Sequence, residues 1–386
     1  MNLLFIAYFP MEPSVGGIQR VTDVLTRELI RRGHIVNFLS LQLGPTSPEL
    51  TTSATQYYIN IEKESNWKNQ IEKLLDKLQV EYIINQSPNA LTNRTLRCVS
   101  TKVKIVSVFH TQPFLNDNVT RKIIVQTKAY SFKQKLFKYL SFIVPSFRSK
   151  VFGHYEKLNI IQTVTISDKV CFISERFFPR VLKHIPDFPK EKLSAINNPN
   201  TFSASVDVSH KENLIVWVGR IDNSNKNTIG FVKIWKNLYE TNPAWKAIVA
   251  GDGEDLDSIK EYAKKHQIRN IKFIGRCDDV MSLYKRAKFV VVTSFSESWC
   301  MVLTEGLANG CVACAYDSYE TVRDIINGNN GFVVSPENPQ MMANKLNELM
   351  NNDFEYTKMS NETYKSVSKY SVENIVNQWE VLLKSL

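Results

Sequence analysis

The chain has 386 residues and a mass of 44.4 kDa, of which 43% are hydrophobic and 22% charged. At roughly 150 residues per domain this length predicts two or three domains, and the composition excludes a largely disordered chain, a collagen-like chain and a coiled-coil rod. Lysine and arginine (48) exceed aspartate and glutamate (38), which gives a formal net charge of +10. Such a balance indicates an anionic partner: nucleic acid, an anionic membrane or a phosphorylated substrate.

No window of 18 consecutive apolar residues occurs, so no membrane-spanning helix is expected. The apolar start from Leu3 to Phe9 follows no cationic residue and precedes no small-residue cleavage site, which favours a buried first strand over a signal peptide. The six cysteines are too few for a disulfide framework. The cytoplasm is therefore the expected location.

The first half of the chain predicts alternating strands and helices. Residues 3–7 form a short apolar strand pattern, apolar residues at helical spacing follow over 21–30, and 35–39 is the next apolar run. Gly33 stands where a helix commonly ends. This βαβ unit implies a parallel sheet with a right-handed crossover. Further strands are expected at 82–84, 103–109 and 170–173.

A second series of strands and helices begins near Asn213, which indicates α/β architecture in two domains of similar size. We expect a first domain over 1–200, a second domain over 201–368, and a helix over 369–386. The predicted strands of the second series are 214–218, 247–250, 271–274, 289–292, 312–315 and 332–334, and the predicted helices are 227–240, 256–266, 279–287, 301–308 and 339–351.

Polar and glycine residues follow three strands of the second series, at the carboxyl ends where open α/β sheets bind ligands. Gly219 and Arg220 end the first strand, and Lys226 begins the next helix pattern. Two cations at this place would bind a diphosphate. The alternative is that both are ordinary solvated side chains. The turn with Gly251 and Gly253 would let the backbone approach a ligand closely. The alternative is a tight strand-to-helix turn without a ligand. Finally, a loop with Gly275 and Arg276 would frame a flat base, or is an ordinary polar strand end.

The fourth and most informative stretch carries two carboxylates eight residues apart, Glu297 and Glu305, on either side of an expected helix start. The free amides of the first helical turn favour an anion, and ionised carboxylates accept hydrogen bonds from sugar and ribose hydroxyls. The alternative is a charge effect at a helix start plus a surface glutamate. The remaining candidate binding residues of this stretch are Ser298, Trp299, Cys300, Met301 and Val302.

Taken together, the order and spacing of Arg220, Lys226, Glu297 and Glu305 resemble the retaining glycosyltransferases of family 4. The resemblance covers nearly the whole chain, and the segment SFSESWCMVLTEGLANG is its most specific part. In the first half, the loop with Gly16 and Gly17, the strand-end His110 and the stretch Phe172-Ile173-Ser174-Glu175 are also similar to that family.

The resemblance implies a GT-B fold, which consists of two Rossmann-like domains facing a central cleft. It makes 1–200 the acceptor-binding domain and 201–368 the nucleotide-sugar-binding domain, with the helix over 369–386 packing back on the first domain. It places Arg220 and Lys226 on the diphosphate of a nucleotide-sugar, Glu305 on the ribose and Glu297 beside the donor sugar. It further implies that Gly17 lends an amide to the distal phosphate and that His110, otherwise an ordinary buried histidine, lies by the reacting carbon. No metal and no cofactor are implied, because the nucleotide-sugar is a substrate and the cations supply the positive charge.

The sequence departs from the family pattern at two neighbouring positions. The family often has glycine where Cys300 stands and phenylalanine where Trp299 stands. These departures put the fit of the sugar in doubt more than the activity. Another carboxylate motif, Asp255-Leu256-Asp257, resembles a metal-binding Asp-x-Asp, but its place after a glycine turn favours helix capping.

The stretch 121–150 carries eight lysine or arginine residues and no acidic residue. Phe132, Leu136 and Tyr139 would share one helical face there, with Lys135 and Lys138 opposite. A cationic amphipathic helix can lie at an anionic membrane surface, which would suit a lipid-linked acceptor and a peripheral place on the inner face of the cytoplasmic membrane. The alternative is a solvated helix packed on its own domain.

We therefore expect a glycosyltransferase that moves a hexosyl or N-acetylhexosaminyl unit from a nucleotide-sugar, most simply a UDP-sugar, to a cell-surface glycan. A polyprenyl-diphosphate-linked saccharide is the preferred acceptor. The alternatives are a non-catalytic nucleotide-sugar-binding relative, a GT-B epimerase and a nucleic-acid-binding protein, although no nucleic-acid motif supports the last of these and no nucleic-acid partner is expected. The sugar, the nucleotide, the linkage and the oligomeric state are not encoded in any recognisable motif.

Overall fold

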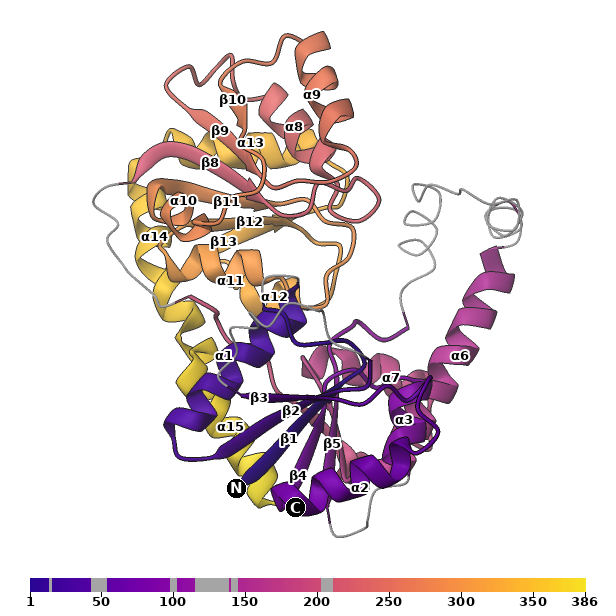
Figure 1. Cartoon of the computed structure of the whole chain (residues 1–386). Helices are drawn as coiled ribbons and strands as arrows, with labels where there is room; N and C mark the ends of the chain where they lie inside the picture. The colour runs from indigo at the N-terminus through magenta and orange to yellow at the C-terminus, as the bar shows by residue number, and fades with distance from the viewer. Residues whose placement is uncertain (14–15, 43–53, 98–102, 115–138, 140–144, 203–210) are drawn as a thin grey trace. The chain divides into compact units, whose positions relative to one another are not determined.

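The structure is a computed structural model, and it describes residues 1–13, 16–42, 54–97, 103–114, 139, 145–202 and 211–386, with the backbone alone for 145–152. The chain divides into two compact units (Figure 1). The first consists of Met1–Phe114, Arg148–Thr201 and Tyr370–Leu386, and the second of Leu115–Phe147 and Phe202–Lys369.

The first unit is built on a seven-stranded parallel sheet with the order β3-β2-β1-β4-β5-β6-β7. Since the strands are parallel, the loops that follow them all emerge at one edge. The order reverses direction between β1 and β4, which is the arrangement of a doubly wound Rossmann-like sheet. Its strands are β1 (Asn2–Ala7), β2 (Ile35–Ser40), β3 (Thr55–Tyr58), β4 (Tyr82–Asn85), β5 (Lys104–Phe109), β6 (Lys169–Phe172) and β7 (Leu193–Ala195).

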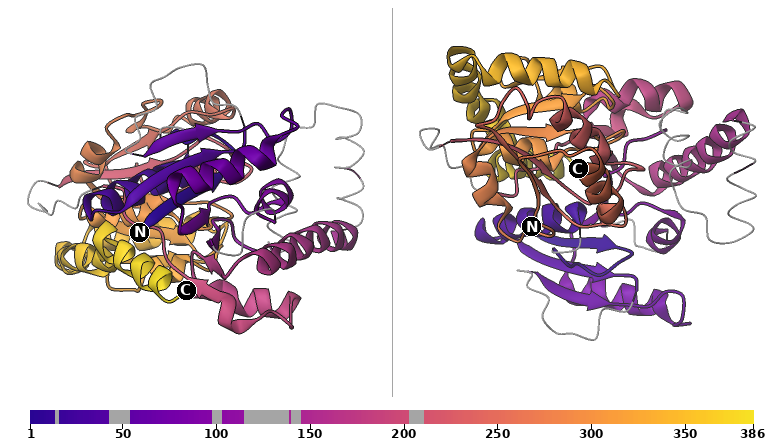
Figure 2. Two further views of the ribbon diagram at one scale, coloured as in Figure 1. Left: turned by 60° about the horizontal axis from the view of Figure 1, so that its bottom comes forward. Right: turned by 90° about the horizontal axis from the view of Figure 1, so that it is seen from above.

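Helices cover both faces of this sheet (Figures 1 and 2). On one face, Trp67, Ile71 and Leu74 pack with Leu4 and Ile83 in an apolar core, because helix and strand each present one apolar face to the other. The helices are α1 (Gly17–Arg31), α2 (Trp67–Leu78), α3 (Ala90–Leu96), α6 (Pro145–Ile166), α7 (Phe178–His184) and α15 (Val372–Lys384).

The final helix of the chain, α15, packs against α1 of the first unit. Arg32, directly after α1, donates from Nη1 to Oδ1 of Asn377 over 2.6 Å, and Nε2 of His34 lies 2.8 Å from Oε1 of Glu380. Besides these polar contacts, α15 has an apolar face on which Ile375 and Val376 are fully buried. The carboxyl terminus therefore belongs structurally to the unit that contains the amino terminus.

The second unit repeats the same design with a six-stranded parallel sheet, in the order β10-β9-β8-β11-β12-β13. The reversal of strand order falls between β8 and β11. The strands are β8 (Glu212–Val218), β9 (Lys246–Ala250), β10 (Ile271–Phe273), β11 (Ala287–Val292), β12 (Val312–Tyr316) and β13 (Gly331–Val334).

Large apolar side chains fill the core between this second sheet and its helices, among them Phe231, Trp235 and Met342, which are completely buried. The helices are α8 (Thr228–Lys236), α9 (Leu256–Lys265), α10 (Val280–Arg286), α11 (Met301–Ala308), α12 (Val322–Ile325), α13 (Pro339–Met350) and α14 (Asp353–Val367). Among the helices of the part of the chain that the structure describes, none is long and apolar enough to cross a membrane.

The predicted α/β class with two parallel sheets is confirmed. The predicted helix over 227–240 is too long, because α8 ends at Lys236. Strands β3 and β7 and helices α12 and α14 were not predicted. β3 is an edge strand without a fully buried residue, and α14 has few apolar positions for its length, so the apolar periodicity of both is weak.

The carboxyl ends of β8 and β9 are joined by unusually close backbone contacts. A Cβ atom at Gly251, whose φ is +151°, would lie 1.8 Å from the carbonyl oxygen of Gly219. A Cβ atom at Gly253 would lie 2.1 Å from that of Ile221. Only glycine fits such positions without displacing the neighbouring loop.

We predict that Gly251→Ala lowers the free energy of unfolding by about 2–4 kcal/mol, because strain and a backbone clash act together. Gly328→Ala is the matched control, since Gly328 also has positive φ (+90°) but no atom within 4 Å of the added Cβ. The control should lose about 1 kcal/mol or somewhat more. Urea unfolding followed by tryptophan fluorescence measures both, and equal losses would contradict the close-contact argument.

Candidate functional site

The candidate site of the second unit lies where its strand order reverses. Nζ of Lys226, in the loop after β8, is 2.6 Å from Oε1 of Glu297, in the loop after β11. The hydroxyl of Ser294 donates to the same oxygen over 2.7 Å. The crevice at such a reversal is the usual ligand position in an open parallel sheet. The structure thus brings together two predicted residues that are 71 positions apart.

Lys226 and Glu297 form a partly buried ion pair, with 27% and 12% of their side chains exposed. Burial alone would lower the pKa of Lys226, but the charge of Glu297 outweighs it, so that the pKa of Lys226 lies above its ordinary value. The ammonium group therefore stays charged at neutral pH and lies in a place where water screens it less than at the surface.

Asp222 organises the loop between Arg220 and Lys226. Its Oδ1 accepts the backbone amides of Ser224 (2.8 Å) and Asn225 (3.3 Å), and the hydroxyl of Ser224 donates to it as well. Its carbonyl oxygen accepts the amide of Lys226 over 2.8 Å. Sequence analysis missed Asp222, although an aspartate two residues after Arg220, before Asn-Ser-Asn, is a signal for a side-chain-stabilised turn.

Asp222 also holds the guanidinium of Arg220. Nη2 of Arg220 lies 2.6 Å from Oδ2 of Asp222, while the Arg220 side chain is 69% exposed and the Asp222 side chain 8%. Burial would raise the pKa of Asp222, but the hydrogen bonds from Ser224 and Arg220 overcome it and keep the pKa of that carboxyl below its ordinary value. One buried carboxylate therefore positions both candidate cations.

The predicted glycine positions converge on the same edge of the sheet. The amide of Gly219 donates to Ala250 over 3.0 Å, and the amide of Gly251 donates to Gly275 over 2.7 Å. The loops after β8, β9 and β10 therefore adjoin one another. Arg276 follows Gly275 with 73% of its side chain exposed, and its Nε is 3.7 Å from the exposed Asp278. Its role at a base stays a prediction.

Helix α11 begins at Met301, four residues after Glu297. Cys300 is its N-cap residue and makes no side-chain cap to the helix amides. Burial raises the pKa of the Cys300 thiol to about 12, so the group remains a neutral thiol. Trp299 beside it is 6% exposed. The first turn of α11, which includes Met301 and Val302, therefore follows a small uncharged residue. The free backbone amides of this turn suit an anion.

Glu305 lies one turn inside α11 and is only 2% exposed. The hydroxyl of the completely buried Tyr284 approaches its Oε2 to 3.4 Å. α11 approaches β11 closely, since a Cβ atom at Gly306 would lie 2.6 Å from Cγ1 of Val290. The alternative of a surface glutamate at position 305 is therefore wrong, because the tight helix–sheet packing buries this carboxylate.

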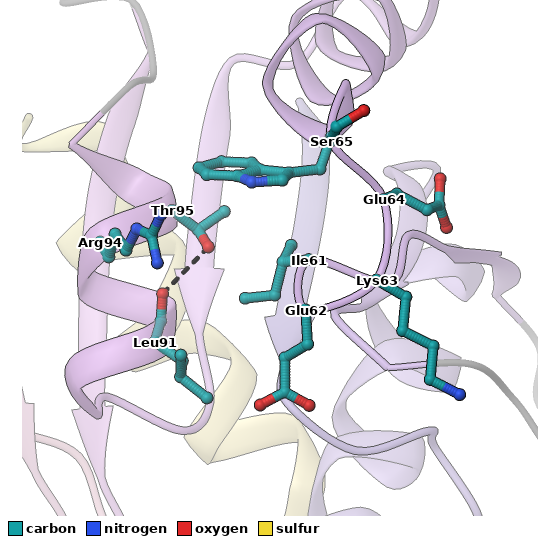
Figure 3. Close-up of a pocket in the computed structure, with 9 residues that line it drawn as sticks. Ile61, Glu62, Lys63, Glu64, Ser65, Leu91, Arg94 and Thr95 are labelled. Carbon is teal, nitrogen blue, oxygen red and sulfur yellow. Dashed lines mark hydrogen bonds between the residues drawn. The ribbon is translucent and has the colours of Figure 1, made fainter.

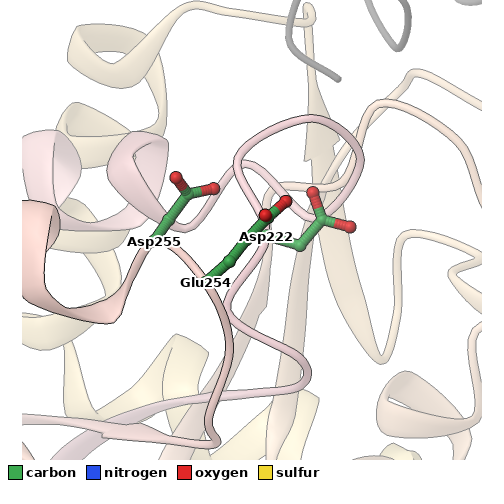
Figure 4. A group of neighbouring side chains, drawn as sticks. All are labelled: Asp222, Glu254 and Asp255. Carbon is green, nitrogen blue, oxygen red and sulfur yellow. The ribbon is translucent and has the colours of Figure 1, made fainter. Parts of the chain in front are cut away.

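Asp222, Glu254 and Asp255 form a group of carboxylates in which the nearest oxygens all lie within 4.8 Å (Figure 4). Asp222 and Asp255 already bind protein groups: Asp222 holds Arg220, and Oδ2 of Asp255 accepts the amide of Asn223 over 2.8 Å. Asp255 takes the N-cap position of α9 but makes no side-chain cap, so the predicted capping role is wrong for its side chain. The carboxylate instead fastens the loop after β8.

The candidates of the first unit lie after β1 and β5. Nε2 of His110 is hydrogen-bonded to Oε1 of Gln86, and its buried Nδ1 has no hydrogen-bond partner among the described residues. Burial lowers the pKa of His110 to about 4, so the ring is neutral at pH 7. Gly16 is the N-cap residue of α1, and Gly17 is the first residue of that helix. Since glycine has no side chain, Gly16 does not cap the amides at the start of α1.

Most of the cationic stretch 121–150 lies outside the described residues. Tyr139 is described and is 63% exposed. The membrane-surface interaction of this stretch stays a prediction.

Comparisons with known proteins agree with this architecture. Residues 200–366 match the family model "Glycosyl transferases group 1". An uncharacterized glycosyltransferase of Haemophilus influenzae is 25% identical over 98% of this chain and 99% of its own length. A Campylobacter jejuni protein, named as an α-1,4-N-acetyl-D-galactosaminyltransferase acting on an undecaprenol-diphosphate-linked saccharide, is 30% identical over 59% of this chain and 61% of its own.

Solved structures share the fold over the whole chain. A variant of TarM from S. aureus, in complex with fondaparinux, α-GlcNAc-glycerol and UDP, superposes with a TM-score of 0.74 at 12% sequence identity. The superposition covers 99% of this chain and all of the TarM chain. HepE of Anabaena, in complex with UDP and glucose, superposes with a TM-score of 0.72 at 15% sequence identity. The superposition covers the full length of both chains. Residues 200–366 of the chain therefore match the glycosyl transferases group 1, and the fold of the chain is the GT-B fold that these solved glycosyltransferases share.

Proposed function

We propose that the protein is a retaining glycosyltransferase of family 4 that uses a nucleotide-diphosphate sugar, with UDP as the nucleotide. The observation that carries this proposal is the convergence of Lys226, Glu297 and Arg220 at the strand-order reversal of the second unit. UDP in the complexes of TarM and HepE supports the choice of nucleotide.

In this proposal the diphosphate binds between the cations and the start of α11. Lys226 acts as a point charge, Arg220 donates paired hydrogen bonds, and the amides near Cys300 add the positive end of the helix. The loops with Gly251 and Gly253 lie against the nucleotide, and Glu305 accepts hydrogen bonds from the ribose hydroxyls. Glu297 fixes Lys226 and accepts a hydroxyl of the donor sugar with its other oxygen.

The chemistry that follows is stabilisation of a leaving group. When the glycosidic bond to the diphosphate breaks, negative charge grows on the departing phosphate oxygen. Lys226 and Arg220 interact with that charge more strongly in the transition state than in the ground state, which accelerates the reaction. The acceptor hydroxyl attacks from the same face and transfers its proton to the departing phosphate, which retains the anomeric configuration. The two cations make a divalent metal unnecessary.

The first unit supplies the acceptor side in this proposal. Neutral His110 lies by the reacting carbon, and the amide of Gly17 by the distal phosphate. The acceptor is a cell-surface glycan, carried on a polyprenyl diphosphate at the membrane surface. The undecaprenol-linked substrate in the name of the Campylobacter relative supports this choice, as do the poly(glycerol-phosphate) of a Bacillus subtilis relative and the amylovoran of an Erwinia amylovora relative.

We predict that Lys226→Ala and Glu297→Ala each lower turnover about 100-fold or more. Lys226→Ala removes the cation that contacts the developing charge, and Glu297→Ala removes the carboxylate that holds that cation in place. The assay is UDP release from a panel of UDP-sugars with and without acceptor glycans. Lys233→Ala, which removes an exposed cation from α8, is the control and should leave turnover unchanged. Near-normal turnover in both site variants would refute the assignment.

Asp222→Asn should lower kcat/KM for the donor by about 10- to 100-fold, since it weakens charge-assisted hydrogen bonds that position Arg220 and the loop before Lys226. Asp257→Asn, an exposed aspartate of α9, is the matched control. Steady-state kinetics with varied UDP-sugar measures the effect. A kcat/KM within twofold of the unsubstituted protein would rule out the positioning role.

Activity should persist in excess EDTA, because protein cations rather than a bound ion offset the charge of the diphosphate. The same UDP-release assay, run with EDTA and then with added Mg²⁺ or Mn²⁺, checks this. Loss of activity in EDTA with recovery on adding either ion would show that a metal is required, and the carboxylate group of Figure 4 would then be the first place to examine.

A further inference from the structure

A pocket of about 590 Å³ opens in the first unit, between the loop after β3 and helices α2 and α3 (Figure 3). Leu91, Arg94 and Thr95 project from α3 on one side, and Ile61, Glu62 and Lys63 come from the loop on the other. The volume falls within the roughly 300–1,000 Å³ that is typical of small-molecule sites. None of the residues assigned to the donor lines this pocket.

The loop that forms one wall is held in place by its own hydrogen bonds. Oδ1 of Asn60 accepts the amides of Glu62 and Lys63, both over 3.1 Å. The carboxylate of Glu64 accepts the amide of Asn60 over 2.9 Å and Nε2 of Gln70 over 2.7 Å. Because both ends of the loop are fastened, the wall is preformed, and a ligand need not order it on binding.

The lining combines an apolar floor with balanced charges. Ile61, Leu91 and the largely buried ring of Trp67 supply apolar surface, and the guanidinium of Arg94 lies 5.9 Å from the centre of the Trp67 ring. The lining includes two acids, Glu62 and Glu64, and two cations, Lys63 and Arg94, so its formal charge is balanced and the pocket does not select an anion. Such a lining suits a neutral polyhydroxylated ring, since carboxylates accept from hydroxyls, cations donate to them and C–H faces pack on apolar side chains.

The pocket adjoins the edge of the sheet that carries His110. The hydroxyl of Tyr8, directly after β1, donates to Oε2 of Glu62 over 3.2 Å, and the amide of Tyr8 donates to the hydroxyl of Ser87 over 2.9 Å. Ser87 follows Gln86, the hydrogen-bond partner of His110. Residues after β1, β3, β4 and β5 therefore link the pocket to the candidate catalytic histidine within one unit.

We infer that this pocket is a subsite for a neutral sugar residue of the acceptor glycan, removed from the residue that receives the transferred sugar. The inference rests on the proposed glycosyltransferase function, and it adds a place where the enzyme recognises the chain that it extends. Glu62 and Arg94 are the groups that hydrogen-bond this sugar, and Ile61 and Leu91 contact its apolar face.

The test is methyl NMR of the full chain with labelled isoleucine and leucine, titrated separately with glucose, galactose, N-acetylglucosamine and N-acetylgalactosamine to about 100 mM, since one sugar ring should bind with a dissociation constant on the order of 1–10 mM. We expect at least one sugar to shift the methyl signals of Ile61 and Leu91 saturably, while Ile375 in α15 stays unchanged. Arg94→Ala and Glu62→Gln should weaken that binding about tenfold or more. Lys73→Ala, an exposed cation on neighbouring α2, is the matched control.

The inference is overturned if none of the four sugars shifts Ile61 and Leu91 saturably, or if both pocket variants bind as tightly as the unsubstituted protein. A parallel titration with UDP, read at the methyl group of Ile221 beside Gly253, tests the second unit separately. UDP binding without sugar binding would refute the subsite and leave the proposed function in place. Sugar binding without UDP binding would confirm that the pocket binds a sugar but refute the UDP-sugar donor of the proposed function.

Discussion

The ion pair between Lys226 and Glu297 is the contact on which the site of the second unit depends. It fastens the loop after β8 to the loop after β11, which are the two strands on either side of the strand-order reversal. Because both side chains are largely covered, loss of either partner would leave a partly desolvated charge without compensation. The same pair keeps the lysine protonated at the place where the proposed reaction develops negative charge.

Around this pair, the backbone is shaped by close approaches that only glycine permits. Gly251 and Gly253 bring the loop after β9 against the loop after β8, and Gly306 brings α11 against β11. These contacts set the position of the helix start and of Glu305 relative to the cations. Asp222 completes the arrangement, since it binds Arg220 with one oxygen and orders the turn before Lys226 with the other.

The two units differ in the charge of their polar groups, in a way that matches the two substrates of the proposed reaction. In the second unit, a lysine and an arginine stand at the end of one strand, where a diphosphate would need them. In the first unit, burial keeps His110 neutral and the pocket by α3 balances its acids with its cations. A neutral saccharide suits the second of these environments better than an anion does.

Local pattern was sufficient to identify the α/β class and most strands of both sheets, and together with the resemblance to family 4 it singled out Lys226 and Glu297 as candidates. Strand ends, glycine turns and helix starts are short-range features, and the resemblance of the motif spacing to family 4 connected them. The same patterns left β3 and α14 unidentified, because an edge strand and a weakly amphipathic helix carry little periodic signal.

Tertiary structure alone decided the order of the strands, and with it which loops meet. Lys226 and Glu297 are neighbours because β8 pairs with β11, a pairing that no local pattern encodes. The burial of Glu305, the use of the Asp255 carboxylate to fasten a loop, and the pocket between β3 and α3 have the same origin. Each depends on side chains distant in sequence that pack together only once the sheets have formed, whereas the sequence by itself determined the elements and the chemistry that they carry.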